Sequence, residues 1–347
     1  MTATETKTIR LGLLGFGGVL RTFAELLLIK HADLLAAYGL DLQVTGIATA
    51  QHGIAINPNG LRLDLALSEP HLRGLHVGEA VTDATVFVET VPADIILEAT
   101  PVSREDGQPA LGYLRAALGA GKHVVTANKG PVVFGYHDLT ALAAERDLDF
   151  FFESTVLDGV PVHAIGRDLL PGAQILAIRG VLNSTTNAIL NRMEEGDSFE
   201  SALREMQAAG IAETDPSNDI DGWDSAIKLA ILANTLMGAN LRPADIAPQG
   251  IRDITHDDIL KATEEGATLK LLCEAFYDNE TGELVARVAP TALDPDDRLA
   301  WLEDTACGVT LITDLLGEMT LIEGPAGTGA TAYGMLVDTL NIARGRR

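Results

Sequence analysis

The sequence is poor in cysteine. Cys273 and Cys307 are its only thiols in 347 residues, too few for a disulfide framework or a cysteine-based zinc site. We therefore expect a reducing, cytoplasmic environment. The polar beginning MTATETKTIR lacks the apolar core of a signal peptide. The longest apolar runs, such as residues 227–236, fall short of the ~18 residues that a membrane-spanning helix needs.

Basic side chains are also scarce. Lys and Arg together number 25 against 49 Asp and Glu, for a formal net charge of −24, and only seven of the 25 are Lys. Because nucleic acids and anionic membranes bind clustered basic side chains, this balance excludes both as partners. An acidic, lysine-poor composition is typical of a salty habitat or of a GC-rich genome, and both explanations stay open.

The first part of the chain alternates short apolar segments with helical patterns. This alternation predicts an α/β fold, a Rossmann-type doubly wound parallel sheet with helices on both faces. Strands are expected at residues 9–15, 42–48, 93–100, 123–128 and 149–154, and helices at 22–29, 109–120 and 138–145.

The pattern changes after about residue 155 and predicts an α+β domain. Strands are expected at residues 175–182, 269–276, 284–289 and 309–313, and helices at 186–195, 199–209, 223–237 and 333–343. We therefore expect a dinucleotide-binding domain over residues 1–155, to which 320–347 return, and a substrate-binding and dimerisation domain over 156–319.

A glycine-rich segment follows the first expected strand and opens a helix. It reads Gly15-Phe16-Gly17-Gly18-Val19-Leu20, and glycines in this context let a dinucleotide pyrophosphate approach a helix N-terminus. Leu20 stands where the fingerprint has Gly or Ala, so a plain turn is the alternative. The second strand ends in Ala48-Thr49-Ala50-Gln51-His52-Gly53, without the acid that binds the ribose of NAD and without an Arg for a 2′-phosphate. This favours NADP over NAD only slightly.

Longer segments resemble the homoserine dehydrogenases. The segments that carry the resemblance are GKHVVTANKG at 121–130, EATP at 98–101, GVLNSTTNAILNRMEEG at 180–196 and AGIAETDPSNDIDGWDSAIKLAIL at 209–232. The resemblance implies a usually dimeric enzyme that interconverts L-homoserine and L-aspartate 4-semialdehyde with NAD or NADP, in threonine, methionine and isoleucine biosynthesis. Relatives usually have Gly at the position of Ser184. Longer members carry a regulatory or aspartokinase domain, and we expect this protein to be a short, monofunctional form without either.

Two lysines are the candidate catalytic residues. Lys228 lies on an expected buried helix, where a charged side chain needs a partner or a task, although a solvated pair with Asp224 is an alternative. Lys129 follows a strand and precedes Gly130-Pro131, so we place it in a loop at the ligand-binding edge of the sheet. The resemblance assigns Lys228 as proton donor and acceptor and Lys129 as its electrostatic partner.

The resemblance also selects binding residues. Five carboxylates lie between residues 213 and 224, a run that by itself could be a solvated loop. The implied substrate contacts are Glu213, Asp219, Asp224, Asn183 and Thr185, and the implied nucleotide contacts are Gly15, Phe16, Gly17, Gly18, Val19, Thr100, Lys129 and Gly327. A monovalent cation, Na⁺, is implied at Glu153, Val156, Asp158 and Val160, with an ion-free Gly-Pro turn as the alternative.

Two other functions remain to be separated from this one. A related Rossmann oxidoreductase acting on another amino-alcohol or semialdehyde is the first, and an aspartate semialdehyde dehydrogenase of that kind would need a nucleophilic cysteine. The second is an inactive dinucleotide-binding paralogue, which Leu20 and Ser184 would favour.

Overall fold

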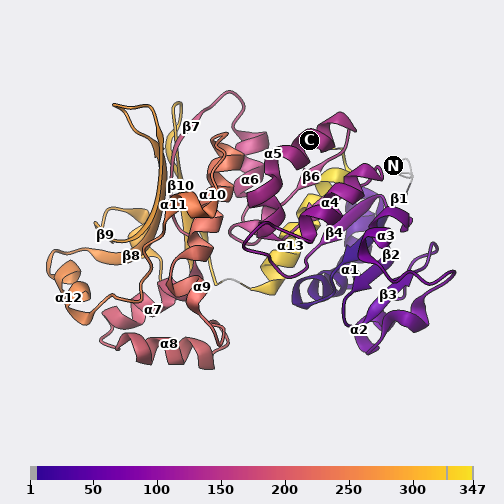
Figure 1. The fold of residues 1–347 in the computed structure, drawn as a ribbon, viewed down its shortest axis with the longest axis horizontal. Coiled ribbons are helices and arrows are strands. Elements are labelled where there is room, and N and C mark those ends of the chain that lie inside the picture. The colour runs from indigo at the N-terminus through magenta and orange to yellow at the C-terminus, as the bar shows by residue number, and fades with distance from the viewer. Residues whose placement is uncertain (1–5, 326, 346–347) are drawn as a thin grey trace. The chain divides into compact units, whose positions relative to one another are not determined.

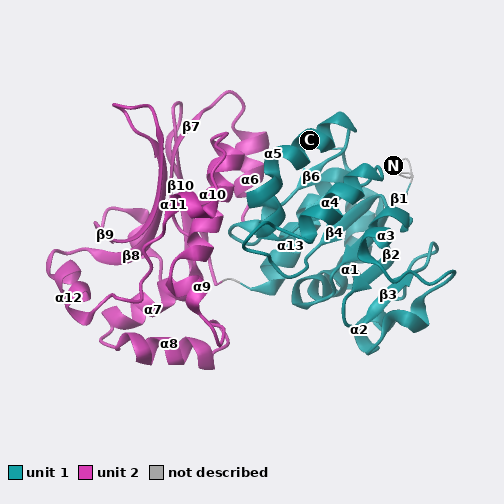
Figure 2. Cartoon of the chain, viewed as in Figure 1, with its two compact units in different colours: residues 1–159, 327–347 teal, residues 160–326 magenta. Residues whose placement is uncertain are grey.

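The chain forms two compact units. The computed structural model describes residues 6–325 and 327–345 (Figure 1). Unit 1 runs to Gly159 and resumes at Gly327, and unit 2 begins at Val160 and ends before Gly327 (Figure 2). The sequence placed these boundaries slightly earlier, at 155/156 and 319/320. No helix of the described residues has the length and apolarity to cross a membrane.

Unit 1 contains a six-stranded sheet in the order β3-β2-β1-β4-β5-β6. The strands are β1 (Lys7–Leu14), β2 (Leu40–Thr49), β3 (Gly53–Ile56), β4 (Ile95–Glu98), β5 (His123–Thr126) and β6 (Phe150–Phe151). All neighbours pair in parallel except β2 and β3. The order of the strands reverses between β1 and β4, because β2 and β3 extend the sheet on one side of β1 and β4 to β6 extend it on the other. Open α/β sheets bind ligands at such a switch point.

Helices cover both faces of this sheet, as the sequence predicted. Leu11 and Leu13 pack in the core with α1 (Gly18–Tyr38) and α13 (Thr328–Ala343). Gly12 points to the other face, where Val91 closely follows α3 (Ala84–Thr90). The helices α4 (Ala110–Gly119) and α5 (Lys129–Glu145) also lie there. Burial on both faces explains the nearly continuous apolar runs of these strands.

Unit 2 contains a five-stranded antiparallel sheet in the order β11-β10-β7-β8-β9. The strands are β7 (Ile175–Val181), β8 (Thr268–Tyr277), β9 (Leu284–Leu293), β10 (Cys307–Thr313) and β11 (Gly317–Glu323). The helices α7 (Ser184–Glu194), α10 (Trp223–Leu236) and α12 (His256–Glu264) all contact β8. The remaining helices of unit 2 include α6 (Val162–Ala164), α8 (Phe199–Ala208), α9 (Ser217–Ile220) and α11 (Pro243–Ile246).

Several elements differ from the sequence prediction. The strands β3 and β11 were not predicted, nor were α2 (Leu63–Ser68) and α3. β3 is an antiparallel edge strand, and β11 extends the sheet of unit 2 although residues from 320 on were assigned to the first domain. Both strands are short or half-exposed edge strands, so their apolar pattern is weak.

The position of Lys129 is a correction. The sequence placed it in a loop and started the next helix at residue 138, but α5 begins at Lys129 itself. Asn128 caps the helix by accepting a hydrogen bond from the Gly130 N–H at 3.0 Å. Pro131 lies in the first turn, where a missing N–H costs nothing, so it does not break the helix.

Candidate active site

The loops after β1 and β4 meet at the switch point of unit 1. Gly15 has φ 92°, which favours glycine, and a Cβ there would lie 2.6 Å from the Ala99 carbonyl oxygen. Its N–H donates to the Ala48 carbonyl at 2.8 Å. The tight turn brings the chain directly into α1, whose N-cap, Gly17, makes no side-chain cap. The first N–H groups of α1 are therefore suited to an anion such as a pyrophosphate.

The beginning of α13 lies beside the beginning of α1. A Cβ on Gly18 would lie 3.5 Å from the Thr328 methyl carbon, so the two helix N-termini adjoin. Gly327, the N-cap of α13, donates its N–H to Asp158 Oδ2 at 3.1 Å. The structure thus brings Gly327 next to the glycine-rich segment, although 309 residues separate Gly327 from Gly18 in the sequence. Of the predicted nucleotide contacts, Phe16 is buried beneath this turn.

Leu20 explains why the glycine fingerprint is incomplete. Its side chain is fully buried in the core between α1 and the sheet. A leucine at this position packs where a third glycine would instead let helix and strand approach more closely. The Leu at position 20 therefore affects how α1 packs on the sheet, and the turn from Gly15 to Gly18 keeps its shape.

The ends of β4 and β5 are joined by a buried carboxylate that the sequence analysis did not assign. Glu98, the last residue of β4, is fully buried and accepts hydrogen bonds from the Thr100 N–H and hydroxyl at 2.7 and 2.6 Å. It also accepts from the Thr126 hydroxyl at 2.6 Å and from Asn128 Nδ2 at 3.2 Å. The residue belongs to the EATP segment, but its role depends on contacts that no local pattern displays.

In unit 2, four predicted residues form one connected cluster. Asn183, the N-cap of α7, donates from Nδ2 to Asp219 Oδ1 at 2.9 Å and to Asp224 Oδ2 at 3.0 Å. Lys228 Nζ lies 3.2 Å from the same Asp224 oxygen and donates to the Leu182 carbonyl at 2.6 Å. The side chain of Lys228 is 17% exposed and that of Asp224 7%, so this pair is not the solvated surface pair considered from the sequence.

The Asn183 amide is fully committed within the protein. Its Oδ1 accepts from the Thr186 N–H at 2.9 Å, which caps α7, while Nδ2 holds the two carboxylates. Both N–H groups and the carbonyl oxygen of the side chain are thereby engaged. The side chain can position Asp219 and Asp224, whereas a substrate contact by Asn183 would have to involve its main chain.

Asp219 lies in an environment that favours its neutral form. Burial raises the pKa of Asp219 above its ordinary value, and the neighbouring Asp224 carboxylate raises it further. Hydrogen bonds from Asn183 and Thr185 lower it in part, as does the Lys228 ammonium. Two carboxylates so close together favour a cationic ligand, because a bound ammonium offsets their repulsion. Thr185 therefore belongs to the same cluster.

Glu213 does not join this cluster in the structure. It is exposed in the connection between α8 and α9, and its carbonyl accepts a hydrogen bond from Gln207 Nε2 at 3.2 Å. In the described part of the chain, no hydrogen bond or ion pair links its carboxylate to Asp219, Asp224 or Lys228.

The predicted cation segment spans the boundary of the two units. Glu153 and Val156 are buried, and Leu157 and Asp158 have φ of 54° and 45°. The Asp158 carboxylate binds Gly327 and the Thr331 hydroxyl, and the Val160 carbonyl accepts from Val162 at 2.8 Å. Among the described residues, no three His, Cys, Asp or Glu side chains gather as metal ligands. The main-chain oxygens of this segment remain the candidate ligands for Na⁺.

Both cysteines are free and buried. Cys273 lies under α10, with Sγ 3.9 Å from the Ser225 carbonyl oxygen, and burial raises the pKa of its thiol to about 12. Such a thiol stays protonated near neutrality and cannot act as a nucleophile. This excludes the thioester chemistry of the alternative considered above for Cys273.

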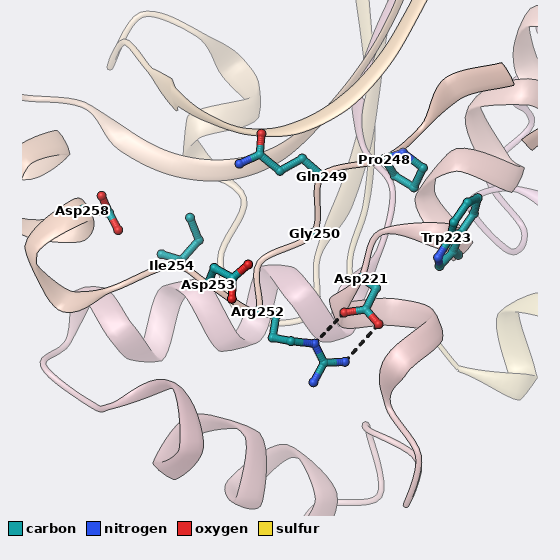
Figure 3. Close-up of a pocket in the computed structure, with 9 residues that line it drawn as sticks. All are labelled: Asp221, Trp223, Pro248, Gln249, Gly250, Arg252, Asp253, Ile254 and Asp258. Atoms are coloured by element: carbon teal, nitrogen blue, oxygen red, sulfur yellow. Dashed lines mark hydrogen bonds and ion pairs between the residues drawn. The ribbon is translucent and has the colours of Figure 1, made fainter. Parts of the chain in front are cut away.

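An open pocket of about 570 Å³ lies elsewhere in unit 2 (Figure 3). Its lining residues are Asp221, Trp223, Pro248, Gln249, Gly250, Arg252, Asp253, Ile254 and Asp258. Arg252 binds Asp221 through two hydrogen bonds of 2.8 and 3.0 Å and fixes the turn that leads into α10. None of the predicted site residues lines this pocket. We infer that its lining residues stabilise the turn before α10.

Comparisons with known proteins identify the family of the chain. Residues 161–340 match the family model of homoserine dehydrogenase. The chain is 36% identical over 337 residues to the NAD(+)-dependent homoserine dehydrogenase of Pseudomonas canavaninivorans, covering 96% of each protein.

Solved structures agree as well. A putative homoserine dehydrogenase from Archaeoglobus fulgidus superposes with a TM-score of 0.85 at 32% identity, covering 96% of this chain and 99% of that one. A hyperthermophilic archaeal homoserine dehydrogenase in complex with NADPH gives 0.81 at 28% identity and covers 98% of both chains. The Rossmann-like sheet of unit 1, the antiparallel sheet of unit 2 and these similarities show that the chain belongs to the homoserine dehydrogenase family of NAD(P)-dependent oxidoreductases.

Proposed function

We propose that the chain catalyses the reversible oxidation of L-homoserine to L-aspartate 4-semialdehyde, with Lys228 as proton donor and acceptor. The observation that carries the proposal is the anchoring of Lys228 Nζ by Asp224 and the Leu182 carbonyl, next to Asp219. Unit 1 is the dinucleotide-binding domain, and unit 2 binds the substrate and forms the dimer. We place the reaction in the biosynthesis of threonine, methionine and isoleucine, in the cytoplasm.

Oxidation of a primary alcohol needs a hydride acceptor and a base. The nicotinamide dinucleotide, when bound, supplies the hydride acceptor. Lys228 takes the hydroxyl proton when its amine is neutral and returns a proton in the reverse direction. Asp219 and Asp224 hold the substrate ammonium group with Thr185 beside them, whereas Glu213, which the resemblance implies as a further contact, lies exposed outside this cluster. Lys129, at the first position of α5, is the second lysine that we propose for the active site.

The dinucleotide fits unit 1 through three local features. Gly15 permits close backbone approach, the N-terminus of α1 lacks a side-chain cap, and Thr100 follows β4 at the switch point. Gly15 to Val19 would hold the pyrophosphate, with Gly327 beside them. Thr100 and Lys129 would hold the nicotinamide end.

NADP is the dinucleotide that we favour. No acid ends β2, and Arg73 from the short turn η1 (Leu72–Leu75) lies beside the following Gly53, where a Cβ would be 3.7 Å from Arg73 Cγ and 4.0 Å from Nε. The Arg73 guanidinium has no hydrogen-bond or ion-pair partner among the described residues. An arginine at this place suits a ribose 2′-phosphate. Opposing this choice, the Pseudomonas relative is named for NAD⁺.

Parallel assays with NADP⁺ and NAD⁺ test both proposals. Purified protein should reduce either nucleotide when L-homoserine is present, measured by the absorbance of reduced nicotinamide. Absence of turnover with both nucleotides, at low and at high salt, would contradict the proposed function. Arg73→Ala should lower kcat/KM for NADP⁺ about tenfold and leave NAD⁺ unaffected, because a charged hydrogen bond is lost. Arg62→Ala, which removes an exposed arginine paired with Asp64, is the matched control.

Na⁺ would be held by main-chain oxygens of Glu153, Val156, Asp158 and Val160. The left-handed backbone at Leu157 and Asp158 supports this proposal, since it keeps the segment out of a regular helix or strand, in which the carbonyls would pair with the backbone. Replacing NaCl by choline chloride at equal ionic strength should lower the melting temperature. An unchanged melting temperature would contradict it.

A second copy of the chain is the partner that we propose. The sheet face opposite α10 carries a partly exposed apolar row, formed by Ile312, Ala177, Phe276 and Val285. Beside it, Arg179 and Arg287 both bind Glu274, at 3.2 and 2.5 Å. Apolar and paired charged groups of this kind suit a two-fold interface between identical subunits. Light scattering should give a dimer mass, and Phe276→Glu should give the monomer mass.

A further inference from the structure

Glu98 combines complete burial with an unusual set of partners. It has no exposed surface, and the four hydrogen bonds that it accepts come from neutral donors. Burial raises the pKa of Glu98, and the hydrogen bonds of Thr100, Thr126 and Asn128 oppose that shift. Keeping an acid in such a place costs free energy, and an apolar side chain would fill the same volume without that cost.

The partners of Glu98 lie on two strand ends and one helix. Thr126 ends β5, and its hydroxyl both donates to Glu98 Oε2 and accepts from the Asn128 N–H at 2.9 Å. Asn128 Nδ2 reaches Glu98 Oε1 and the Thr100 carbonyl at 3.1 Å, while its Oδ1 caps α5 through Gly130. A single carboxylate thereby ties the loop after β4 to the first turn of α5.

The loop after β4 packs against that same turn. A Cβ on Gly130 would lie 2.9 Å from the Ser103 carbonyl oxygen, and a Cβ on Gly107 would lie 2.8 Å from the Gly130 carbonyl oxygen. With such close packing, a displacement of either segment moves the other. The segment that follows Thr100 and the helix that begins at Lys129 are therefore held in a fixed position relative to each other.

We propose that Glu98 is a positioning residue of the nucleotide site, whose carboxylate fixes Thr100 and Lys129 in the geometry that hydride transfer requires. The proposal rests on the proposed function, because that function places Thr100 and Lys129 at the nicotinamide. Glu98 itself touches neither nucleotide nor substrate in this assignment. It acts through hydrogen bonds within unit 1.

The chemistry of the network explains why a carboxylate is needed. Four donors converge on Glu98, so its two oxygens must both accept. Glutamine has one accepting oxygen, and its NH₂ group would face a donor in either orientation. If the NH₂ group faced Thr126, the Thr126 hydroxyl would have to accept from it as well as from the Asn128 N–H, and the hydroxyl proton would lose its acceptor at Glu98. Glu98→Gln therefore preserves the shape of the side chain and disrupts the network.

The experiment compares Glu98→Gln and Thr126→Val with Asp149→Asn. Asp149 is a buried acid of the same sheet, but it pairs with His123 at 3.1 Å near the start of β5, the opposite end from the site. Each variant is assayed with NADP⁺ and with L-homoserine carrying hydrogen or deuterium at the reacting carbon. The melting temperature and the NADPH dissociation constant are measured on the same samples.

We expect Glu98→Gln to lower kcat about tenfold or more, since small displacements of reacting groups are costly. The deuterium isotope effect on kcat should rise, because a slowed hydride transfer replaces product release as the limiting step. Thr126→Val should change kcat in the same direction, and the double variant should be less impaired than the product of the two single effects. Asp149→Asn should change kcat less than about twofold, whatever its effect on melting temperature.

The proposal would be overturned if Glu98→Gln lowered kcat no more than Asp149→Asn does and left the deuterium isotope effect unchanged. If Glu98→Gln does not fold, Thr126→Val decides by the same two measurements. If the wild type does not oxidise homoserine, the proposed function fails, and NADPH affinity then decides about Glu98. The NADPH dissociation constant of Glu98→Gln should be about threefold or more above that of Asp149→Asn, which corresponds to the loss of at least one weak hydrogen bond. Equal NADPH dissociation constants in the two variants would refute the positioning role of Glu98.

Discussion

Lys228 and Asp224 lie one helical turn apart on α10, with Nζ 3.2 Å from Oδ2, and Asp224 Oδ2 also accepts from Asn183. The ammonium group is held from the other side by the Leu182 carbonyl at 2.6 Å. These contacts fix the ammonium end of the long, flexible Lys228 side chain beside the carboxylates of Asp224 and Asp219. A lysine held in this way can exchange a proton with a substrate hydroxyl at a defined position.

Replacing this lysine tests its role directly. Lys228→Ala should lower kcat by at least about a hundredfold, because general acid–base catalysis contributes on that order. NADPH binding should stay within about twofold of the wild type, since unit 1 holds the nucleotide in our proposal. Lys261→Ala, an exposed lysine of α12, is the control. Loss of NADPH binding in Lys228→Ala would instead indicate a structural lysine.

The Asn183 amide should set the pH dependence of substrate binding. Asp219 must be ionised to hold the substrate ammonium, so kcat/KM falls as the pH decreases through its pKa, which burial and Asp224 raise. Asn183→Ala removes a hydrogen bond that lowers this pKa, and the acid limb of the profile should move to higher pH. A uniform loss of kcat/KM, with the limb unmoved, would show that Asn183 only supports the fold.

Cys273 should be inert although it lies near the site. Because burial raises the pKa of its thiol to about 12, the thiolate is scarce at pH 8. Iodoacetamide should leave the activity of the native enzyme unchanged, and both cysteines should react only after unfolding. Mass spectrometry of the treated protein checks this. Rapid inactivation with one label on Cys273 would reopen the possibility of cysteine chemistry.

Lys270 should make the stability of unit 2 depend on pH. Its Nζ is buried among neutral acceptors, Asn187 and Asn191 at 2.9 Å and the Leu302 carbonyl at 2.6 Å. Burial lowers the pKa of Lys270 from 10.5 to about 8. Between these values the unfolded chain binds more protons than the folded one, so stability rises with pH.

Comparison with Lys270→Met isolates this contribution from other titrating groups. Between pH 7.5 and 9.5 the free energy of unfolding of the wild type should rise by about 2 kcal/mol relative to the variant. Urea unfolding at each pH measures the difference. A difference that does not change with pH would mean that Lys270 titrates as an exposed lysine.

Local signals in the sequence were sufficient for part of the site. Gly15 and Gly18 are adjacent in the chain to a strand and a helix, and Asp224 and Lys228 share one helix, so spacing alone predicted on which elements these residues lie. Lys129 was assigned to a loop because Gly130-Pro131 suggests a break, whereas the Asn128 cap starts a helix there. Capping depends on a side-chain contact that the dipeptide pattern does not reveal.

The sequence by itself determined the alternating fold of unit 1, the family and the residue types of the site, because periodicity, glycine turns and long motifs are local properties of the chain. The tertiary structure alone decided which groups meet. It placed Glu98 between Thr126 and Asn128, Asn183 between two carboxylates, and Arg73 beside the end of β2. These contacts join residues that lie 20 to 41 positions apart in the sequence, and only packing brings such residues together.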